Sequence, residues 1–417
     1  MRISTVTMFE QSTASINRQQ SDFIKISQQI ASGRRVVNPS DDPQAASRAV
    51  GVDQSKAMTQ QFADARVTAR NSLAQTESIL NSISDAVTSA KTLLIQASSD
   101  TLSDVDRESI ASELTGIYET MLGQANATDG NGRYLFGGYK DNAPPFVKSA
   151  DGSVEYNGDS SVRQQRVDAS RLMPVAENGV TVFQGVPSGA GYIAEANREN
   201  QGSVTFSGPQ LTDINDPGYG DSYRIVFSED ASLDSGVSYH VQRFSDGAWQ
   251  EDAANAVASG EYLGEGQQLS FGGLSVTLTG SAEPDDEILV AQGGSEQRGA
   301  DLFRTMEAAI RVLETPAQNA TDKAALRNTL NTSMRDLDNA LDNVLTVRAS
   351  AGARLNELDV IDAVGSNRML NYEQTLSDLV DLDYADAISE YSLRQVGLQA
   401  AQKAFVDIRS MSLFDYM

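Results

Sequence analysis

The chain has 417 residues, a formal net charge of −25 and no cysteine. This length is enough for two or three domains with a sizeable core. The strong negative charge argues against nucleic acid or an anionic membrane as the main partner, and the lack of cysteine excludes disulfides and thiolate metal sites.

Two kinds of targeting segment are not expected from the sequence. No run of about 18 apolar residues occurs, so we predict no membrane-spanning helix. Residues 1–8 lack the apolar stretch of a secretory signal peptide. If the protein leaves the cytoplasm, we expect it to be exported by another route, without a cleaved signal peptide.

The first predicted helix carries an apolar residue at every seventh position. The row consists of Phe9, Ile16, Phe23, Ile30 and Val37. Such a row forms a seam along a helix, and the seam must be buried against another helix. A terminal helix with no adjoining globular body has little else to bury against, so we expect this seam to pack between chains.

A proline-bounded motif follows this row. It consists of Asn38, Pro39, Ser40, Asp41, Asp42 and Pro43. Proline interrupts a helix but is favoured at its first position, and acidic residues stabilise a helix start. The motif therefore predicts a break between two helices. We interpret Asp41 and Asp42 as helix-start residues in preference to a catalytic acid pair.

The part of the chain after the break is predicted to be helical. No proline occurs in residues 44–143, and residues 44–98 have the periodicity of one long helix. Ser103 is placed to cap a further helix. The apolar rows within residues 62–97 predict the core of a helical bundle, not a surface for other chains.

The middle of the chain is predicted to be rich in strands and turns. Seven of the ten prolines lie in residues 144–284, and 25 of the 32 glycines lie in residues 128–300. Strand-like runs occupy residues 203–206, 223–227, 239–244 and 274–278, and a hairpin is expected around Asp151–Gly152. The acidic run Glu283–Glu287 predicts a solvated turn.

The last third returns to helical patterns. We expect a short helix over residues 302–313 and a long one capped by Thr321, with residues 330–358 in the bundle core. A second terminal seam follows, formed by Tyr384, Tyr391, Leu398 and Phe405, with Ile408 three residues beyond. Seams at both ends predict that the termini pair with each other, with neighbouring copies, or both. The ten residues of the two seams are our predicted assembly interface.

The sequence offers no candidate active site. His240 is the only histidine, and without cysteine no histidine-based metal cluster can form. We interpret His240 as a structural residue of a strand. The expected protein is not an enzyme and uses no cofactor.

Short motifs near both ends resemble one protein family. They are Met1–Thr5, Gln29–Ala46, Gly132–Gly138, Gly352–Asn356, Asp381–Ile388, Leu398–Phe405 and Ser412–Tyr416. As an ordered set they resemble the hook-associated protein 3 family of bacterial flagella, which is related in its helical ends to flagellin.

The resemblance implies a fold that agrees with the composition. The expected fold is mainly α with a β-rich inserted domain, a flagellin-like discontinuous helical bundle with long coiled-coil-type N- and C-terminal helices. The expected domains are a terminal coiled-coil region that lines an inner tube (1–42 plus 376–417), a helical shaft with a β-hairpin part (43–194 plus 293–375), and an outer β-rich domain (195–292).

The resemblance also implies partners and a location. Family members are structural adaptors that form a ring between hook-associated protein 1 and the flagellin filament, outside the cell. They are exported through the flagellar type III apparatus, with a chaperone bound near the C-terminus. No nucleic acid and no membrane is implied as a partner.

Three alternatives stay open at this point. The chain could be flagellin itself, although flagellins tend to lack the Pro-Ser-Asp-Asp-Pro pattern. It could carry an enzyme, such as a surface hydrolase, in the β insertion, although no convergent acid, base and nucleophile set is visible. A type III translocator would be expected to contain a long apolar segment.

Overall fold

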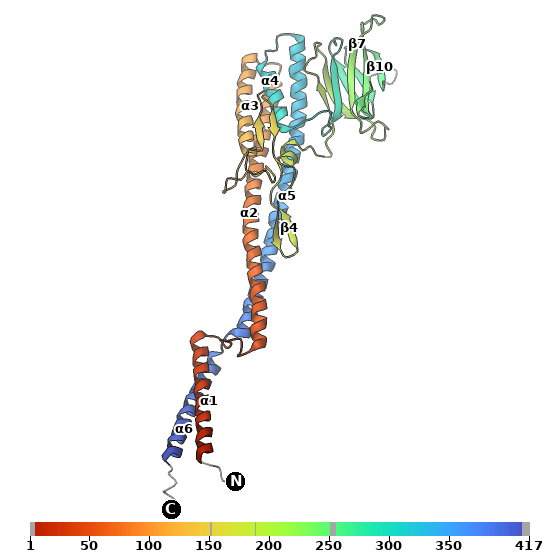
Figure 1. Cartoon of the computed structure of the whole chain (residues 1–417). Helices are drawn as coiled ribbons and strands as arrows, with labels where there is room; N and C mark the ends of the chain where they lie inside the picture. Colours follow the sequence, from red (N-terminus) through yellow and green to blue (C-terminus); the bar gives the residue numbers. More distant parts are fainter. Residues whose placement is uncertain (1–4, 151, 188, 251–255, 411–417) are drawn as a thin grey trace, which may run out of the picture. The chain divides into compact units, whose positions relative to one another are not determined.

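The computed structural model describes residues 5–150, 152–187, 189–250 and 256–410. The chain divides into two compact units, Met1–Arg66 with Asp359–Met417, and Val67–Leu358. Two long helices, α2 (Pro43–Ala97) and α5 (Ala320–Val380), contribute residues to both units (Figure 1). The predicted fold class, mainly α with a β-rich insertion between helical ends, is confirmed.

Local sequence signals start the shorter helices of the larger unit. Helix α3 (Asp104–Ala125) begins with a capping box, in which Ser103 Oγ accepts from Asp106 N and Asp106 Oδ2 accepts from Ser103 N. Helix α4 (Leu302–Glu314) is capped by Asp301, whose carboxylate accepts from Arg304 N at 2.7 Å. The predicted cap at Ser103 is therefore confirmed.

The start of α5 differs from the prediction. Asn319, not Thr321, caps the helix, because Asn319 Oδ1 accepts from Asp322 N at 2.7 Å. The Thr321 hydroxyl instead donates to Gln201 O at 2.9 Å. The predicted cap at Thr321 is wrong because a contact distant in sequence takes its hydroxyl.

The helical core of this unit forms from the apolar rows that the sequence predicted. Residues of both rows are no more than 1% exposed: Ala69, Leu73, Leu80, Ile83, Val87, Ala90, Leu94, Leu330, Leu337, Val344, Ala351 and Leu358. At one end of this core, the Phe303 ring lies 5.2 Å from Phe146 and 5.6 Å from Phe183, measured between ring centroids. The prediction that these rows form an internal bundle core is confirmed.

Replacing Phe303 with alanine should destabilise the larger unit strongly. The side chain is 1% exposed, and its loss leaves a cavity among three other rings. Phenylalanine-to-alanine changes at such sites cost about 3–5 kcal/mol. Denaturant unfolding monitored by circular dichroism should show this loss, whereas Tyr139→Ala, at a 60% exposed position, should change stability little. Equal stability of the two variants would contradict the packing described here.

The strands form two hairpins and two antiparallel sheets. The hairpins are β1 (Phe146–Lys148) with β2 (Val154–Tyr156), and β3 (Gln164–Asp168) with β4 (Arg171–Pro174). A π-helical turn, η1 (Val180–Gln184), follows them. The larger sheet has the order β10-β8-β7-β13-β5 with β9 beside β8, and the smaller has the order β11-β12-β6. Their strands are β5 (Tyr192–Ala196), β6 (Thr205–Leu211), β7 (Tyr223–Glu229), β8 (Val237–Ser245), β9 (Ala248–Trp249), β10 (Ala258–Glu261), β11 (Gln267–Phe271), β12 (Leu274–Thr279) and β13 (Glu287–Gln292).

The two sheets enclose one apolar core of their own. Tyr223, Ile225 and Phe227 enter it from alternate positions of β7, as expected for a strand with one buried face. Because β5 pairs with β13 along its whole length, this domain begins at Tyr192. Strand β5 thus lies across the domain limit expected at residue 195, and the expected limits stay a prediction.

The sequence predicts that the acidic turn before β13 is solvated. The structure shows that part of this turn is buried. Asp286 is 2% exposed, and its carboxylate accepts from Gln201 N at 2.7 Å, Gly202 N at 3.0 Å and Glu283 N at 3.0 Å. A buried carboxylate needs several donors to offset its loss of hydration. Asp286 therefore ties this turn to the segment after β5.

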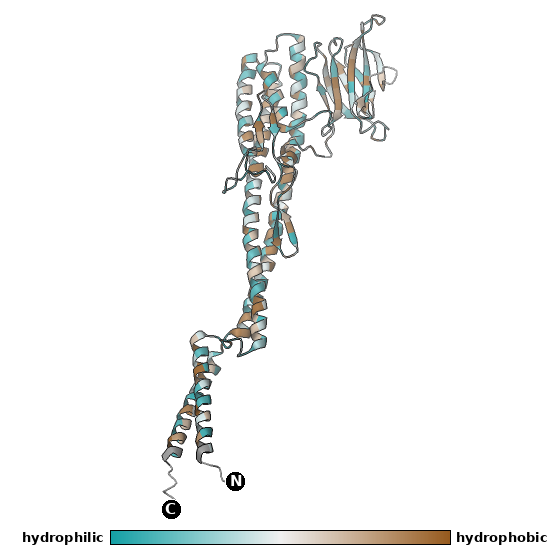
Figure 2. Cartoon of the chain, in the orientation of Figure 1, coloured by the Kyte–Doolittle hydropathy of each residue, from teal (hydrophilic) through white to brown (hydrophobic). Residues whose placement is uncertain are grey.

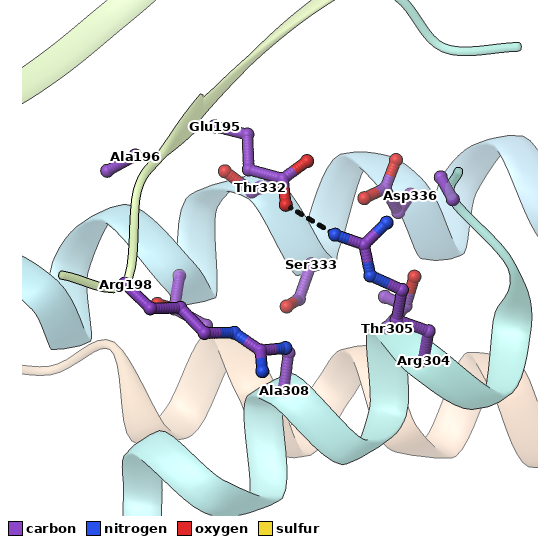
Figure 3. Close-up of a pocket in the computed structure, with 11 residues that line it drawn as sticks. Glu195, Ala196, Arg198, Arg304, Thr305, Ala308, Thr332, Ser333 and Asp336 are labelled. Atoms are coloured by element: carbon purple, nitrogen blue, oxygen red, sulfur yellow. Dashed lines mark hydrogen bonds and ion pairs between the residues drawn. The ribbon is translucent and has the colours of Figure 1, made fainter. Parts of the chain in front are cut away.

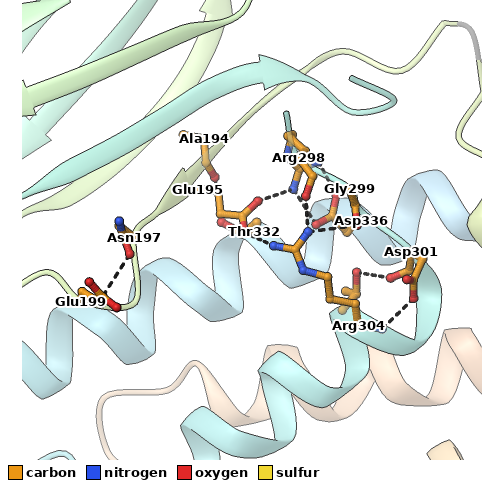
Figure 4. Close-up of polar contacts among 11 residues, drawn as sticks. Ala194, Glu195, Asn197, Glu199, Arg298, Gly299, Asp301, Arg304, Thr332 and Asp336 are labelled. Carbon is orange, nitrogen blue, oxygen red and sulfur yellow. Dashed lines mark hydrogen bonds and ion pairs between the residues drawn. The ribbon is translucent and has the colours of Figure 1, made fainter. Parts of the chain in front are cut away.

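Polar side chains of α5 hold the β domain against the helices. Asn328 Nδ2 donates to Val204 O at 2.8 Å, and Thr332 Oγ1 donates to Ala194 O at 2.7 Å. Arg298, whose side chain is fully buried, donates from both terminal nitrogens to Asp336. Figure 4 shows this arginine with Asp336 and Glu195. Loss of the acidic partner of such a buried cation would destabilise the fold. The contact between Arg298 and Asp336 therefore fixes how the loop before α4 meets α5.

Two kinds of feature are absent from the residues that the structure describes. None of the helices described has both the length and the apolar character needed to cross a membrane. Groups of three or more histidine, cysteine or acidic side chains arranged to hold a metal ion are absent from the described ranges.

Candidate assembly interface

The two terminal seams pack against each other within one chain. Helix α1 (Thr5–Ser32) and helix α6 (Tyr384–Ser410) run antiparallel in the smaller unit (Figure 1). Phe9 lies 5.2 Å from Phe405 and Phe23 lies 4.9 Å from Tyr391, measured between ring centroids. Aromatic pairs at such distances add about 0.5–1.5 kcal/mol to the effect of area burial alone. The rows predicted from each end therefore meet.

The remaining predicted residues are less uniform. Ile16, Ile30 and Leu398 are partly buried, while Tyr384 is 51% exposed. Ile408 is part of α6, but its side chain lies outside the described residues. Val37 follows the end of α1, so the sevenfold row does not continue along a helix at this point, and neighbouring Val36 is buried instead.

A second apolar surface on α6 stays exposed, and the sevenfold row does not predict it. Its residues are Ile388, Leu393, Val396 and Val406, each between 55% and 72% exposed. With about 3.6 residues per turn, Leu393 and Val396 fall on the side of α6 opposite the residues that face α1, and Ile388 and Val406 lie on one flank of the helix. Figure 2 shows hydrophobic residues on both terminal helices. A helical wheel could have found this surface, because its residues lie between the positions of the sevenfold row. We name these four residues the outer α6 face.

Both helix breaks in this unit occur beside each other and are joined by backbone hydrogen bonds. Arg35 N donates to Val380 O at 2.7 Å, and Leu382 N donates to Gly33 O at 3.0 Å. Gly33 has φ +70°, a conformation that glycine adopts readily and that ends α1. A Cβ at this position would also lie 3.0 Å from the Tyr384 hydroxyl oxygen. The segments 33–35 and 380–382 thus form a fixed joint between the two helix pairs.

The two acids of the proline-bounded motif have different tasks. Asp42 Oδ1 accepts from Ala45 N at 3.0 Å, so Asp42 is a helix-start residue of α2, as predicted. Asp41 Oδ2 accepts from Asn38 N at 2.9 Å and from Val37 N at 3.2 Å, which closes the loop instead. Pro43 is the first residue of α2, and Pro39 and Ser40 are exposed between the acids and the preceding helix.

The same contacts lower the pKa of both carboxyl groups. The Asn38 amide, followed by Lys25 at 3.1 Å, lowers the pKa of Asp41. The Ala45 amide, followed by Arg35 at 3.2 Å, lowers the pKa of Asp42. Hydrogen bonds and cations stabilise the charged form of a carboxyl group, so both groups stay ionised over most of the pH range.

Acid should loosen this joint through Asp41 and Asp42. A carboxyl group whose pKa is lower in the folded protein stabilises the fold above its unfolded pKa, and the stabilisation is lost as pH falls through the folded value. We expect hydrogen-exchange protection of the Val37 and Asn38 amides to fall below about pH 4. Asp41→Asn should reduce that protection already at neutral pH, whereas Asp53→Asn on the exposed side of α2 should not. Unchanged protection in Asp41→Asn would refute the role given to this carboxylate.

His240 takes part in a contact between side chains of one strand. It lies in β8, and its ring Nε2 is 3.1 Å from Gln242 Nε2. Burial, and then the charge of Arg224, lower the pKa of His240 and favour the neutral ring. Its placement in a strand agrees with the structural interpretation from the sequence.

Comparisons with known proteins agree with this architecture. The model of the bacterial flagellin N-terminal helical region matches residues 3–141. Over 415 residues, the chain is 33% identical to flagellar hook-associated protein 3 of Escherichia coli (strain K12), covering 99% of both proteins. The crystal structure of Xanthomonas campestris FlgL is similar with a TM-score of 0.64 and 30% identity, over 78% of this chain and 99% of that chain. Flagellar hook-associated protein 3 from Legionella pneumophila gives a TM-score of 0.64 and 26% identity over 79% and 98% of the two chains. With a relative this similar along its entire length, the chain belongs to the flagellar hook-associated protein 3 family.

Proposed function

We propose that this protein is a structural adaptor of the bacterial flagellum, which joins the hook, through hook-associated protein 1, to the flagellin filament. The observation that carries the proposal is the pair of terminal helices α1 and α6, whose seams meet while the outer α6 face stays exposed. A two-helix unit with a further apolar side needs neighbours to bury it. Full-length similarity to proteins named hook-associated protein 3 supports the junction as the place where those neighbours are found.

The proposed assembly interface has two layers. The first layer consists of the seams, Phe9, Ile16, Phe23, Ile30 and Val37 with Tyr384, Tyr391, Leu398, Phe405 and Ile408, which shape the paired ends. The second layer is the outer α6 face, which would contact neighbouring copies in a ring. The proposed inner-tube region comprises residues 1–42 and 376–417, and it includes the joint formed by segments 33–35 and 380–382. The protein would then join the two structures by its shape alone, because one chain presents surfaces that match two different lattices.

The remaining parts of the proposal concern how the chain reaches its place. We infer export through the flagellar type III apparatus without a cleaved signal peptide, with a chaperone bound near the C-terminus. The exposed apolar residues of α6 support this inference, since an amphipathic helix in a groove is a common mode of protein recognition. Before assembly, these exposed apolar residues would be covered by the chaperone. The mature protein would be extracellular, in the flagellum, and would act without a cofactor or catalysis.

Immunogold labelling of isolated flagella tests the location. An antibody against the β domain should label one band between hook and filament. Labelling along the entire filament would instead identify a flagellin and refute the adaptor role. Labelling of the hook alone, or of the cell surface away from flagella, would also refute it.

A further inference from the structure

A groove crosses the outer face of the larger sheet in the β domain. Its volume is about 550 Å³, within the range of about 300–1,000 Å³ that is usual for small-molecule pockets. Its floor includes residues paired across three strands, with Leu289 of β13 between Glu195 of β5 and Arg224 of β7. These side chains point away from the core between the sheets, because the residues on either side of Arg224 point into it. We name this space the Trp249 groove, after the aromatic residue that lines it.

The floor of the Trp249 groove offers apolar surface on a fixed frame. Leu289 and Trp249 both line the groove and are partly buried. The Arg224 guanidinium packs over the Trp249 ring, with its Cζ atom 4.9 Å from the ring centroid. Arg224 is itself held by Glu287 at 3.1 Å and by Gln242 Oε1 at 2.7 Å. A ligand therefore meets a floor whose side chains are positioned before binding.

The charges that line the groove cancel each other. Three arginines and three glutamates contribute to it: Arg198, Arg224, Arg304, Glu195, Glu199 and Glu287. Arg224 contacts Glu287, and Arg304 contacts Glu195 at 3.1 Å. Figure 3 shows Arg304 beside Glu195, at the small cavity that adjoins the groove. A charged ligand would find no opposite surplus here, so the groove favours a neutral one.

Three polar groups around the floor retain hydrogen-bonding capacity. The Trp249 indole N–H, the Gln297 amide NH₂ and the Glu199 carboxylate make no hydrogen bond or ion pair with another residue in the described ranges. Gln297 is held through its other amide atom, since its Oε1 accepts from Ser222 Oγ at 2.9 Å. The backbone of Glu199 is held as well, because Glu199 N donates to Asn197 Oδ1 at 3.1 Å (Figure 4). Two donors and one acceptor thus lie around a partly apolar floor.

We propose that the Trp249 groove binds a neutral saccharide chain. A sugar ring has an apolar face of C–H groups and a rim of hydroxyl groups, and each hydroxyl both donates and accepts. The apolar face matches Leu289 and the Trp249 indole, whose body is apolar and whose N–H is polar. The hydroxyl groups donate to Glu199 and accept from Gln297. This inference gives the β domain a binding function of its own and does not depend on the proposed junction role.

The fluorescence of Trp249 tests the proposal directly, because Trp249 is the only tryptophan of the chain. Purified full-length protein is titrated with neutral trisaccharides of glucose, galactose, mannose or N-acetylglucosamine, and with the anionic trisaccharide trigalacturonate. We expect at least one neutral trisaccharide to change the emission of Trp249 saturably. Trigalacturonate should bind several-fold more weakly, since the groove has no surplus positive charge to balance its carboxylates.

Variants show whether the bound saccharide lies in the groove. Binding is measured by ligand-observed nuclear magnetic resonance, which does not need the tryptophan. Trp249→Ala should weaken binding by about tenfold, through lost stacking area and one lost hydrogen bond. Glu199→Ala should weaken it several-fold. Glu265→Ala, at an exposed acid between β10 and β11, is the matched control and should bind like the original chain.

Each outcome decides the proposal. Saturable binding of a neutral trisaccharide that weakens in Glu199→Ala but not in Glu265→Ala supports the site. Thermal unfolding checks the fold, and Glu199→Ala should unfold like the control because its carboxylate bonds to no other described residue. If no neutral trisaccharide binds saturably, or if Glu199→Ala and Glu265→Ala bind equally, the site is overturned. Binding of trigalacturonate as strong as that of the neutral trisaccharides would overturn the ligand class.

Discussion

Removing residues 383–417 should abolish filament attachment and motility while leaving the larger unit folded. The truncation deletes α6, and with it the partners of Phe9 and Phe23. Tyr391, Leu398 and Phe405 are partly buried. Full burial of a large apolar side chain is worth roughly 1.5–3 kcal/mol, so the loss of all three removes on the order of a few kcal/mol of packing. Helix α1 alone then has too little apolar burial to offset the backbone entropy of ordering it, about 1–2 kcal/mol per residue.

The measurement has a genetic and a biophysical part. A strain that carries only the truncated chain should be non-motile and should release flagellin into the medium. Unfolding of the purified truncated chain should retain the transition of the larger unit, since none of its core residues lies beyond Leu358. Normal motility in this strain would contradict the assembly role of α6.

A point substitution separates the two layers of the proposed interface. Leu393→Asp on the outer α6 face, at a 72% exposed position, should leave the pairing of α1 with α6 intact but prevent assembly. The same change at Leu263, 63% exposed in the β domain, is the matched control. If both variants assemble normally, the outer α6 face is not buried in the flagellum.

Local signals in the sequence were sufficient for most of the helical architecture. The lack of proline and the apolar rows predicted α2 and α5, and the Ser103–Asp106 pattern predicted the start of α3. These features depend on residues close in sequence, whose spacing directly reflects the period of a helix. The strand-like runs in β6, β7, β8 and β12 could also be predicted, because they too depend on residues close in sequence.

Features that depend on distant residues could not be predicted in this way. The limits of the β domain depend on β5 pairing with β13, about ninety residues away. The place where the first seam leaves the helix depends on Gly33 and on hydrogen bonds to residues 380–382.

Excising residues 192–292 should leave a folded helical protein that is secreted and still forms the junction. The two ends of this segment are already adjacent, since Gly293 N donates to Gly191 O at 3.1 Å. Residues paired in this way lie roughly 5 Å apart, so a linker of one or two glycine or serine residues can close the gap. Closing a short gap between fixed ends adds little loop entropy.

The physical reason for this tolerance is that the two cores share no residues. The β domain buries its apolar side chains between its own sheets, whereas the helical core is built from α2, α3, α4, α5 and the β1–β2 hairpin. On α5, the excision removes the partners of Asn328 and Thr332, whose side chains can bond to water instead of Val204 O and Ala194 O.

The excision needs a control that removes another segment of the same unit. Deleting Leu302–Glu314 takes out α4, which supplies Phe303 and Met306 to the helical core, so that chain should not fold. Thermal unfolding, secretion into the medium and swarming on soft agar would be measured for both chains. A chain without residues 192–292 that is stable and secreted, yet supports no filament, would show that the β domain is part of the hook–filament junction. Retained motility would place the adaptor function in the helical parts, where the paired ends and the outer α6 face lie.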